Sequence, residues 1–437
     1  MPKALVTRRS ILKGAIAAAA APYVIPASAL GLGDRPAPSN RLGVGSIGVG
    51  GRGGGHVRQL LEEKDTEVLA VCDVDTRHRE SNKRVVQDRY SKDAPGTYAG
   101  CRDYADFREV LGRSDIDAVV IAAPDHWHGL MSFMAAKAGK DIYCEKPMAS
   151  VIGDGRAAAD AVKRYGRVFQ TGSQERSGGG RFACELVRNG YLGKIHTIRT
   201  YLPMEAHCLA PQGDARPMPV PDGFDYDMWL GPTPWAPYTD KRCHFNFRWI
   251  LDYSDGELTD RGAHVNDIAL WGAGPLLVGP VEIVATEGKF RNDTLWDVPI
   301  HFHIEYTYSS GMKIICESSG KRGIKFEGTD GWVFVNIHGG RLEAEPESLL
   351  RTVLGPSDIL LPRSKGHMRN WLDAIKTRGT TVAPAEEGHR TASFCHLGII
   401  ALLLQRKLKW DLEREQFIGD ADANHYVSRP TRSPWHF

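Results

Sequence analysis

Short apolar runs alternate with segments of helical spacing along the first part of the chain. The runs that predict buried strands are 42–49, 67–73, 118–122, 142–144 and 168–170. The segments whose apolar residues recur at helical spacing are 77–90, 103–111, 128–138 and 150–165. Strands that alternate with helices form a parallel sheet. We therefore predict an α/β fold that begins with a parallel sheet.

Later in the chain, residues 281–337 predict successive strands without helices between them. The clearest are 300–308, 312–317 and 331–336. Short strands joined by tight turns indicate an antiparallel or mixed sheet. A long apolar helix is predicted over 386–406. We predict a C-terminal α/β domain with an open, largely antiparallel sheet.

The first 29 residues have the three parts of a bacterial export signal. An Arg8-Arg9 pair is followed by an apolar stretch and by the A-x-A cleavage site Ala27-Ser28-Ala29. The apolar stretch is too short to span a bilayer, so no stable membrane anchor is expected. We predict a twin-arginine signal over 1–29, a linker over 30–39, a periplasmic location, and the twin-arginine export machinery as a partner.

Composition narrows the classes of function. The 437 residues are 42% hydrophobic and 25% charged, as is usual for globular proteins. The 55 lysines and arginines barely exceed the 53 acidic residues, which argues against nucleic acid as a partner. The eight cysteines include no CxxC pair, and His301 and His303 have no third ligand at metal spacing. We predict no metal site.

A glycine-rich turn follows the first predicted strand and precedes a helix. Gly48, Gly50 and Gly53 have the GxGxxG spacing, and Arg52 lies among them. The first glycine permits a tight turn, the second lets the backbone approach a pyrophosphate, and the third lets the helix pack closely. Phosphates are favoured at the N-terminus of such a helix. We predict a dinucleotide-binding Rossmann domain over 40–173.

Asp73 ends the second predicted strand, at the position where such domains bind the adenosine ribose. A carboxylate there accepts the ribose hydroxyls and repels a 2′-phosphate, so NAD is favoured over NADP. Arg77 could instead reach a phosphate, so NADP stays open. We predict NAD as the cofactor, with NADP as the alternative.

Ligands of a parallel sheet bind at the carboxyl ends of its strands. The segments at those ends are Pro124–His128, Glu145-Lys146-Pro147 and Gly172–Gln174. Lys146 follows a buried strand and precedes a proline that cannot continue a helix. Its ammonium is therefore expected at the ligand edge of the sheet.

These motifs resemble the Gfo/Idh/MocA family of sugar and inositol oxidoreductases in order and spacing, from about residue 40 to the end. Glu145-Lys146-Pro147 is the most specific mark. The resemblance implies that Lys146 contacts the substrate hydroxyl and the nicotinamide ribose, and that Glu145 and His128 seat the cofactor. It also implies a homo-oligomer, because one face of the second sheet forms a subunit interface in relatives.

The family's second mark is an acid and a histidine four positions apart. Here they are Asp260 and His264, with Asp267 three positions further on. On one continuous helix the three share a face. Oxidation of a secondary alcohol needs a base for the hydroxyl proton, and histidine suits this task near neutral pH. We predict His264 as the base, Lys146 as its electrostatic partner, and Asp260 as the residue that holds the tautomer of His264.

Residues 203–247 contain eight prolines, and so long a loop inside a domain is usually functional. Aromatic side chains suit the C–H faces of a sugar ring. The predicted substrate-binding residues are Arg248, Trp249, Tyr253 and Asp267, within a substrate-binding and oligomerisation domain over 174–437.

The predicted function is an NAD(P)-dependent oxidoreductase that transfers hydride between a CH–OH of a sugar, cyclitol or polyol and a tightly bound nicotinamide cofactor. No soluble NAD pool is expected in the periplasm, so a second substrate would reoxidise the cofactor in place. A redox-assisted glycoside hydrolase of the same superfamily is the alternative, although the resemblance would place a tyrosine where Arg261 stands. A non-catalytic sugar-sensing or redox-sensing protein is the third hypothesis.

Overall fold

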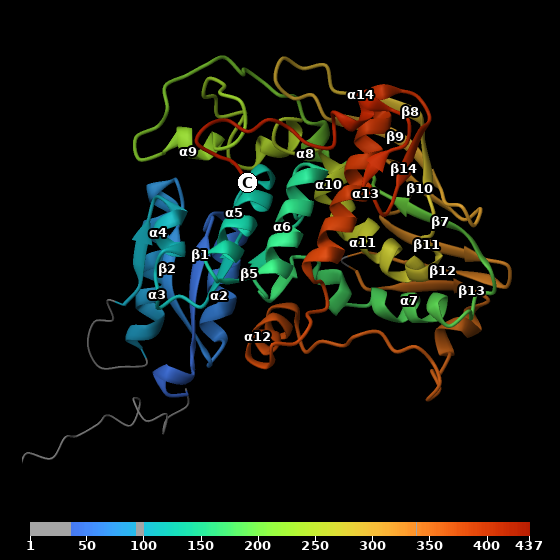
Figure 1. Ribbon diagram of the computed structural model, residues 1–437, viewed down its shortest axis with the longest axis horizontal. Coiled ribbons are helices and arrows are strands. Elements are labelled where there is room, and N and C mark those ends of the chain that lie inside the picture. Colours follow the sequence, from blue (N-terminus) through green and yellow to red (C-terminus); the bar gives the residue numbers. More distant parts are fainter. Residues whose placement is uncertain (1–35, 93–99, 338) are drawn as a thin grey trace, which may run out of the picture.

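A six-stranded parallel sheet forms the N-terminal part of the computed structural model, which describes residues 36–92, 100–337 and 339–437. The strand order is β3-β2-β1-β4-β5-β6 (Figure 1). The strands are β1 (Leu42–Ile47), β2 (Thr66–Cys72), β3 (Arg102–Tyr104), β4 (Ala118–Ile121), β5 (Asp141–Cys144) and β6 (Phe169–Thr171). The order reverses at β1, and ligands bind beside that point in sheets of this kind. The predicted Rossmann architecture is confirmed.

Helices cover both faces of this sheet. They are α2 (Gly51–Glu62), α3 (Thr76–Ser91), α4 (Phe107–Leu111), α5 (Asp125–Lys137) and α6 (Ile152–Arg164), after the short η2 (Pro38–Asn40). One buried cluster holds Phe107 and Trp127, from α4 and α5, and the other holds Leu60 and Val86, from α2 and α3. The helix predicted over 103–111 is wrong in its first part, because the edge strand β3 forms there and pairs with β2.

A helix from far along the chain completes the second of these clusters. Trp371 and Leu372 of α12 (His367–Thr377) are buried together with Val44 and Val68 of the sheet. The chain therefore returns to the first domain after building most of the second (Figure 1). By its packing α12 is part of the Rossmann domain, although it lies within the range 174–437.

The second sheet has nine strands in the order β13-β12-β11-β7-β10-β9-β8-β14-β15. They are β7 (Ile195–Tyr201), β8 (Val281–Phe290), β9 (Pro299–Thr307), β10 (Lys313–Glu317), β11 (Gly323–Gly328), β12 (Gly331–Val335), β13 (Leu342–Glu345), β14 (Leu408–Asp411) and β15 (Gln416–Phe417). Only β7 and β10 pair in parallel among these neighbours in the described residues. The prediction of an open, largely antiparallel sheet is confirmed.

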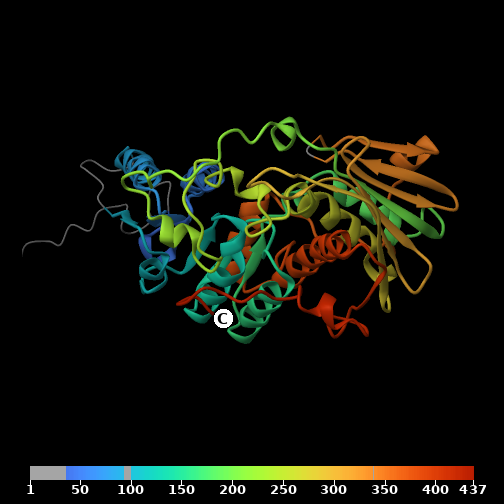
Figure 2. The same cartoon turned by 90° about the horizontal axis from the view of Figure 1, so that it is seen from above.

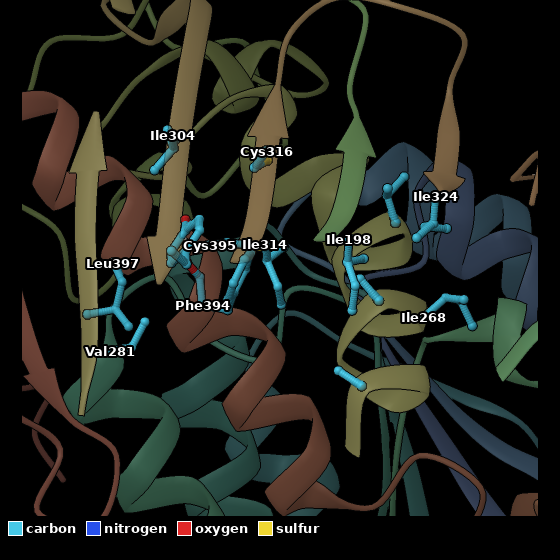
Figure 3. Close-up of a cluster of buried hydrophobic side chains, with 14 of the residues drawn as sticks. Ile198, Ile268, Val281, Ile304, Ile314, Cys316, Ile324, Phe394, Cys395 and Leu397 are labelled. Atoms are coloured by element: carbon cyan, nitrogen blue, oxygen red, sulfur yellow. Dashed lines mark hydrogen bonds between the residues drawn. The ribbon is translucent and has the colours of Figure 1, made fainter. Parts of the chain in front are cut away.

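Three helices, α7 (Gly180–Arg188), α11 (Gly262–Ala273) and α13 (Ala385–Leu404), pack with this sheet. Figure 3 shows Ile268 of α11 and Leu397 of α13 among strand residues such as Ile198 and Ile304, all in one buried cluster. Seen from above, the long helices gather on one side of the sheet (Figure 2). The sheet thus holds α11, which carries His264, and α11 packs on α13, which meets α6 of the first domain.

A long segment between β7 and α11 crosses from the second domain to the first. We call residues 202–256 the strap; it contains α8 (Ala206–Leu209), α9 (Tyr226–Leu230) and η4 (Asn246–Trp249). The N–H of Asp225 donates to the carbonyl of Val74 at 3.0 Å, and the N–H of Thr76 donates to that of Gly223 at 2.9 Å. The strap is therefore fastened to the turn between β2 and α3.

The remaining elements are short: η3 (Gln174–Ser177), α10 (Glu257–Asp260), η5 (Gly274–Leu276), η6 (Glu347–Arg351) and α14 (Ala421–Asn424). The predicted export signal, 1–29, lies outside the described residues. Within the described ranges, no helix has the length and apolar character needed to cross a bilayer.

Candidate active site

A cavity of about 750 Å³ lies between the carboxyl edge of the first sheet and the strap. Its wall includes the turn after β1, Asp73 after β2, Lys146 after β5, and Asp260 with His264 from the second domain. The strap contributes Phe245. Both domains therefore build one site, at the edge where parallel sheets bind ligands.

The glycine turn has no room for side chains at two of its positions. Gly48 has φ +76°, and a Cβ on Gly53 would lie 1.8 Å from the Gly48 carbonyl oxygen. A Cβ on Gly51, at the start of α2, would meet no atom within 4 Å. Open space at a helix N-terminus, reached over a tight glycine turn, fits the pyrophosphate of NAD.

Asp73 lies at the cavity wall, where the sequence predicts the adenosine ribose to bind. Its Oδ1 accepts from the N–H of Asp75 at 2.9 Å and lies 3.4 Å from Nδ1 of His78. The hydrogen bond with Asp73 raises the pKa of His78. Arg77 is instead directed at Asp75, with Nη2 to Oδ2 at 2.7 Å, and its side chain is 74% exposed. The geometry favours a ribose hydroxyl over a phosphate.

Glu145 sits under the cavity floor in a network of donors. Its Oε1 accepts from Arg52 Nε at 3.0 Å and from Gln174 Nε2 at 2.9 Å, and lies 2.7 Å from His56 Nε2. Burial opposes ionisation, but the hydrogen bond and charge of His56 and the charge of Arg52 outweigh it and hold the pKa of Glu145 well below its usual range. Arg52 is thus fixed beside the glycine turn.

Lys146 and Asp260 form the link between the two domains within the site. The Lys146 ammonium donates to Asp260 Oδ1 at 2.5 Å and to the Asp260 carbonyl oxygen at 2.8 Å. Arg248 Nε donates to the same Oδ1 at 3.3 Å. Burial opposes ionisation of Asp260, but the charges of Lys146 and Arg248 outweigh it and hold its pKa well below the usual range. The carboxylate therefore positions the lysine, a role that the sequence did not predict.

His264 reaches the cavity from a separate helix. The helical run breaks at Arg261, so that Asp260 ends α10 and His264 lies in the first turn of α11. Both side chains still line the cavity, with Lys146. The structure therefore brings the three predicted catalytic residues together.

His128 braces the turn that carries Lys146. Its Nδ1 lies 2.7 Å from the carbonyl oxygen of Pro147, and its Nε2 lies 2.8 Å from that of Ala123. The ring borders the cavity and ties together the segments after β4 and β5. Its role in seating the cofactor stays a prediction.

Comparison with known proteins identifies the family. Residues 42–173 match the oxidoreductase-family NAD-binding Rossmann fold of Gfo/Idh/MocA proteins, and residues 207–437 match the family's C-terminal α/β domain. The chain belongs to the Gfo/Idh/MocA oxidoreductase family.

Curated relatives of this Gfo/Idh/MocA protein match over part of their length. Glycosyl hydrolase family 109 protein 2 of Shewanella sp. (strain ANA-3) is 35% identical over 159 residues, which is 33% of this chain and 34% of that protein. A family 109 protein of Shewanella pealeana is 31% identical over 121 residues, 28% of this chain and 26% of that protein. The chain thus matches about a third or less of these relatives.

Solved structures share the fold across both domains. A levoglucosan dehydrogenase in complex with NADH and levoglucosan has a TM-score of 0.60 at 18% identity, covering 84% of this chain and 99% of that one. The aldose-aldose oxidoreductase of Caulobacter crescentus, complexed with glycerol, has a TM-score of 0.59 at 18% identity, with 84% and 99% covered. The cofactor class of the family is NAD, as the sequence predicted.

Three predicted substrate residues of this family member do not reach the cavity. Asp267 lies one turn beyond His264 on α11, is buried, and accepts from Arg176 Nε and Nη2 at 2.8 and 2.7 Å. Trp249 and Tyr253 are buried in the aromatic cluster that holds the strap together. Of the predicted set, Arg248 alone lines the cavity in the described structure.

The structure also adds residues that the sequence did not assign to the site. Phe245 and Phe247 of the strap line the cavity, as do Gln174 and Arg261. Gln174 follows β6 at the sheet's ligand edge, and Arg261 stands between Asp260 and His264. Their positions in the sequence could therefore have indicated that they belong to the site. The two phenylalanines had no such signal, because only the fold of the strap places them at the cavity wall.

A set of titratable side chains closes the Asp73 end of the cavity. Asp75, His78 and His244 each place a potential metal-ligand atom within 4.8 Å of the others. Oxygens of Asp75 already accept from the N–H and the guanidinium of Arg77. Because His244 belongs to the strap, chain spacing could not show this group. It adds a contact between the strap and the start of α3.

Proposed function

We propose that this protein is an exported, NAD-dependent oxidoreductase that acts on a CH–OH group of a sugar, cyclitol or polyol. The observation that carries the proposal is the convergence of Lys146, Asp260 and His264 on one cavity that also contains the glycine turn. A base, a fixed cation and a dinucleotide cradle are the parts that alcohol oxidation requires.

Each side chain has a defined part in the proposed reaction. NAD, when bound, supplies the acceptor for a hydride at its nicotinamide ring. His264 takes the hydroxyl proton while the C–H bond breaks and its electron pair leaves with the hydrogen. The Lys146 ammonium stabilises the negative charge that develops on the oxygen. Asp260, held ionised, keeps that ammonium in place.

The proposed location requires that the cofactor stay bound. The strap crosses the cavity and is fastened to the turn after β2, which favours retention of a dinucleotide. A second carbonyl substrate then takes the hydride back in the same site, so no free NAD is needed.

Replacing Arg8 and Arg9 by lysine should leave the precursor in the cytoplasm, because the export receptor reads this pair.

The first experiment uses protein purified without added nucleotide. Denaturation of one sample should release nicotinamide nucleotide. In native protein, single turnovers with a panel of sugars and polyols should change the absorbance of the bound nucleotide. His264→Ala and Lys146→Ala should slow this step ~10²- to 10⁴-fold. Arg216→Ala, a change at an exposed ion pair of the strap, serves as the control. Protein that neither retains nor binds NAD contradicts the proposal, as does a His264→Ala rate within about threefold of wild type.

A second candidate function rests on the curated relatives named as glycosyl hydrolases of family 109. In this case the oxidation is transient: the ring carbon is oxidised, the aglycone is eliminated, water adds to the resulting double bond, and the hydride returns to the carbonyl carbon. Release of p-nitrophenol from p-nitrophenyl glycosides without net oxidation of the sugar would favour it. Net conversion of the sugar to an oxidised product would favour the oxidoreductase.

A further inference from the structure

Arg261 differs from the other cations that line the cavity. Arg52 donates to Glu145, while Lys146 and Arg248 donate to Asp260. Within the described residues the guanidinium of Arg261 forms only the longer ion pairs with Glu205 and Glu257, and its buried Nε has no hydrogen-bond partner there. A guanidinium has five N–H donors, and buried donors are normally satisfied. Such a group beside the reacting residues points to an acceptor on the ligand.

The carboxylates near Arg261 compensate its charge only in part. Glu205 Oε1 lies 3.4 Å from Arg261 Nη2 but accepts a hydrogen bond from Arg322. Glu257 Oε2 lies 4.0 Å from Arg261 Nε. Burial, together with the charge of Asp260, raises the pKa of Glu257 to about 7, so this group is only partly ionised at neutral pH. Positive charge therefore remains at this part of the wall.

A second arginine of the wall has donor capacity left. Arg248 spends Nε on Asp260 and Nη1 on the carbonyl oxygen of Phe245, which leaves Nη2 without a hydrogen bond in the described structure. Its Cζ lies 4.3 and 4.6 Å from the ring centroids of Phe245 and Phe247. These contacts hold the guanidinium plane in place. The arginine comes from the strap, whereas Arg261 comes from the junction of α10 and α11.

Acidic side chains also border the cavity and contribute to the charge of its wall. Asp125 is buried, accepts from Ser254 at 2.7 Å, and has its pKa raised by burial. Glu175 is a further acid of the wall. A hydroxyl oxygen of a neutral ligand accepts from Arg261 without charge assistance, whereas an anionic group accepts from several of its donors at once through stronger, charge-assisted bonds.

We propose that the substrate is an acidic carbohydrate whose anionic group binds Arg261, with Arg248 beside it. The inference rests on the proposed function for its carbohydrate class and adds the charge. A carboxylate matches the guanidinium fork in a bidentate manner, and a sulfate or phosphate ester offers the same acceptor geometry. Arg261 is thus a specificity-determining residue; in the chain it follows Asp260, which positions Lys146, and precedes the proposed base His264 by three residues.

The test measures binding by calorimetry on the NAD-loaded mature protein, with matched sugars. D-glucuronate is compared with D-glucose, D-galacturonate with D-galactose, and D-galactose 6-sulfate forms the ester arm. At least one acidic sugar should bind about tenfold or more tightly than its neutral partner, since a charge-assisted bond is worth over 1.4 kcal/mol. The arm with the stronger preference identifies the anion as carboxylate or ester.

Variants then assign the preference to Arg261. Arg261→Gln should abolish it and Arg261→Lys should keep part of it, while Arg216→Gln, on the exposed surface of the strap, should leave it intact. Thermal unfolding establishes that each variant is folded. The inference is overturned if no acidic sugar binds more tightly than its neutral partner, or if the preference survives Arg261→Gln.

This outcome is separable from that of the proposed function. Binding of acidic sugars through Arg261 without any hydride transfer would refute the oxidoreductase and leave the anion site standing. Turnover of neutral sugars with no acidic preference would do the reverse.

Discussion

Glu145 shows how closely single residues are fitted on the cofactor side of the cavity. A Cβ added to Gly172 would lie 2.5 Å from Glu145 Oε2. Gly172→Ala should therefore displace the carboxylate from His56 and Arg52, and lower both the unfolding free energy and NAD affinity. We expect the free energy of unfolding to fall by roughly 2–4 kcal/mol, as for overpacking combined with a disturbed buried charge. Urea unfolding and nucleotide titration measure the two effects.

Gly55→Ala is the matched control for this prediction. A Cβ there meets no atom within 4 Å, and the residue lies inside α2. Alanine in a helix is favoured over glycine by about 0.5–1 kcal/mol, so this variant should be slightly stabilised. If Gly172→Ala were as stable as wild type, the close fit around Glu145 would be disproved.

Asp73 supports a prediction about cofactor choice. Asp73→Ser removes the charge that disfavours a 2′-phosphate while keeping an oxygen for the turn to Asp75. The dissociation constant for NADP divided by that for NAD should fall about tenfold or more, which is equivalent to about 1.4 kcal/mol. Calorimetry on nucleotide-free protein measures this, with Arg77→Ala expected to have little effect. Tighter binding of NADP than NAD by wild type would refute the assignment.

At the scale of elements, the strap is held in place by the C-terminal tail, which contains Arg432 and Trp435. Arg432 Nη1 donates to Asp227 Oδ1 at 2.5 Å and Nε donates to the Gly231 carbonyl oxygen at 3.0 Å. Trp435 packs on Trp127 of α5, with ring centroids 4.8 Å apart. The tail therefore ties the strap to the first domain, close to where Figure 1 marks the C-terminus.

Loosening this tie should speed the release of the cofactor. Arg432→Ala removes the side-chain bonds to the strap, so we expect NAD to dissociate roughly tenfold faster, as the loss of a charged hydrogen bond implies. Exchange of bound NAD against labelled NAD measures the rate. Arg414→Ala, an exposed change in the same C-terminal region, should leave it unchanged. Equal rates in the Arg432 variant and wild type would show that the strap does not limit release.

At the scale of the whole molecule, the two domains are interleaved. His367 begins α12, and its Nε2 lies 2.7 Å from the Thr171 carbonyl oxygen while Nδ1 lies 2.9 Å from Ser177 Oγ. A neutral ring satisfies both contacts, donating from Nε2 and accepting at Nδ1. Burial lowers the pKa of His367 to about 4. The joint between α12 and β6 therefore depends on an uncharged histidine.

The sign of the pH effect follows from this pKa. The unfolded histidine binds a proton near pH 6.5 and the folded one only near 4, so its contribution is complete above pH 6.5 and is lost as the pH falls toward 4. Asp154, whose pKa burial raises to about 7, acts in the opposite direction. We therefore compare wild type with His367→Gln instead of reading one pH profile.

The stability advantage of wild type over His367→Gln should shrink by roughly 1.5 kcal/mol between about pH 6.5 and 5. Urea unfolding at several pH values measures it. The exposed His196→Gln should give a difference that does not change with pH. A constant difference for His367→Gln as well would show that this histidine is not held neutral.

The sequence allowed the location of a site residue to be predicted where that location depends only on the adjacent strand. The glycine turn, Asp73 and the tripeptide with Lys146 each follow a strand directly, so their place at the sheet edge follows from local pattern. The burial of Asp267 was not predictable, because helix spacing does not show that Arg176, a distant residue in the chain, meets it there. The bidentate contact with Arg176 then places it in the core rather than at the substrate.

The sequence by itself determined the alternation of strands and helices in the first domain, the dinucleotide turn and the identity of the residues with suitable chemistry, because these depend on hydrophobic period and short motifs. Only the tertiary structure decided that Asp260 holds Lys146, 114 residues away, that α12 completes the first domain, and that the buried Nε of Arg261 has no hydrogen-bond partner among the described residues. Those outcomes depend on which distant segments meet, and on the burial and charge that result, which no local pattern encodes.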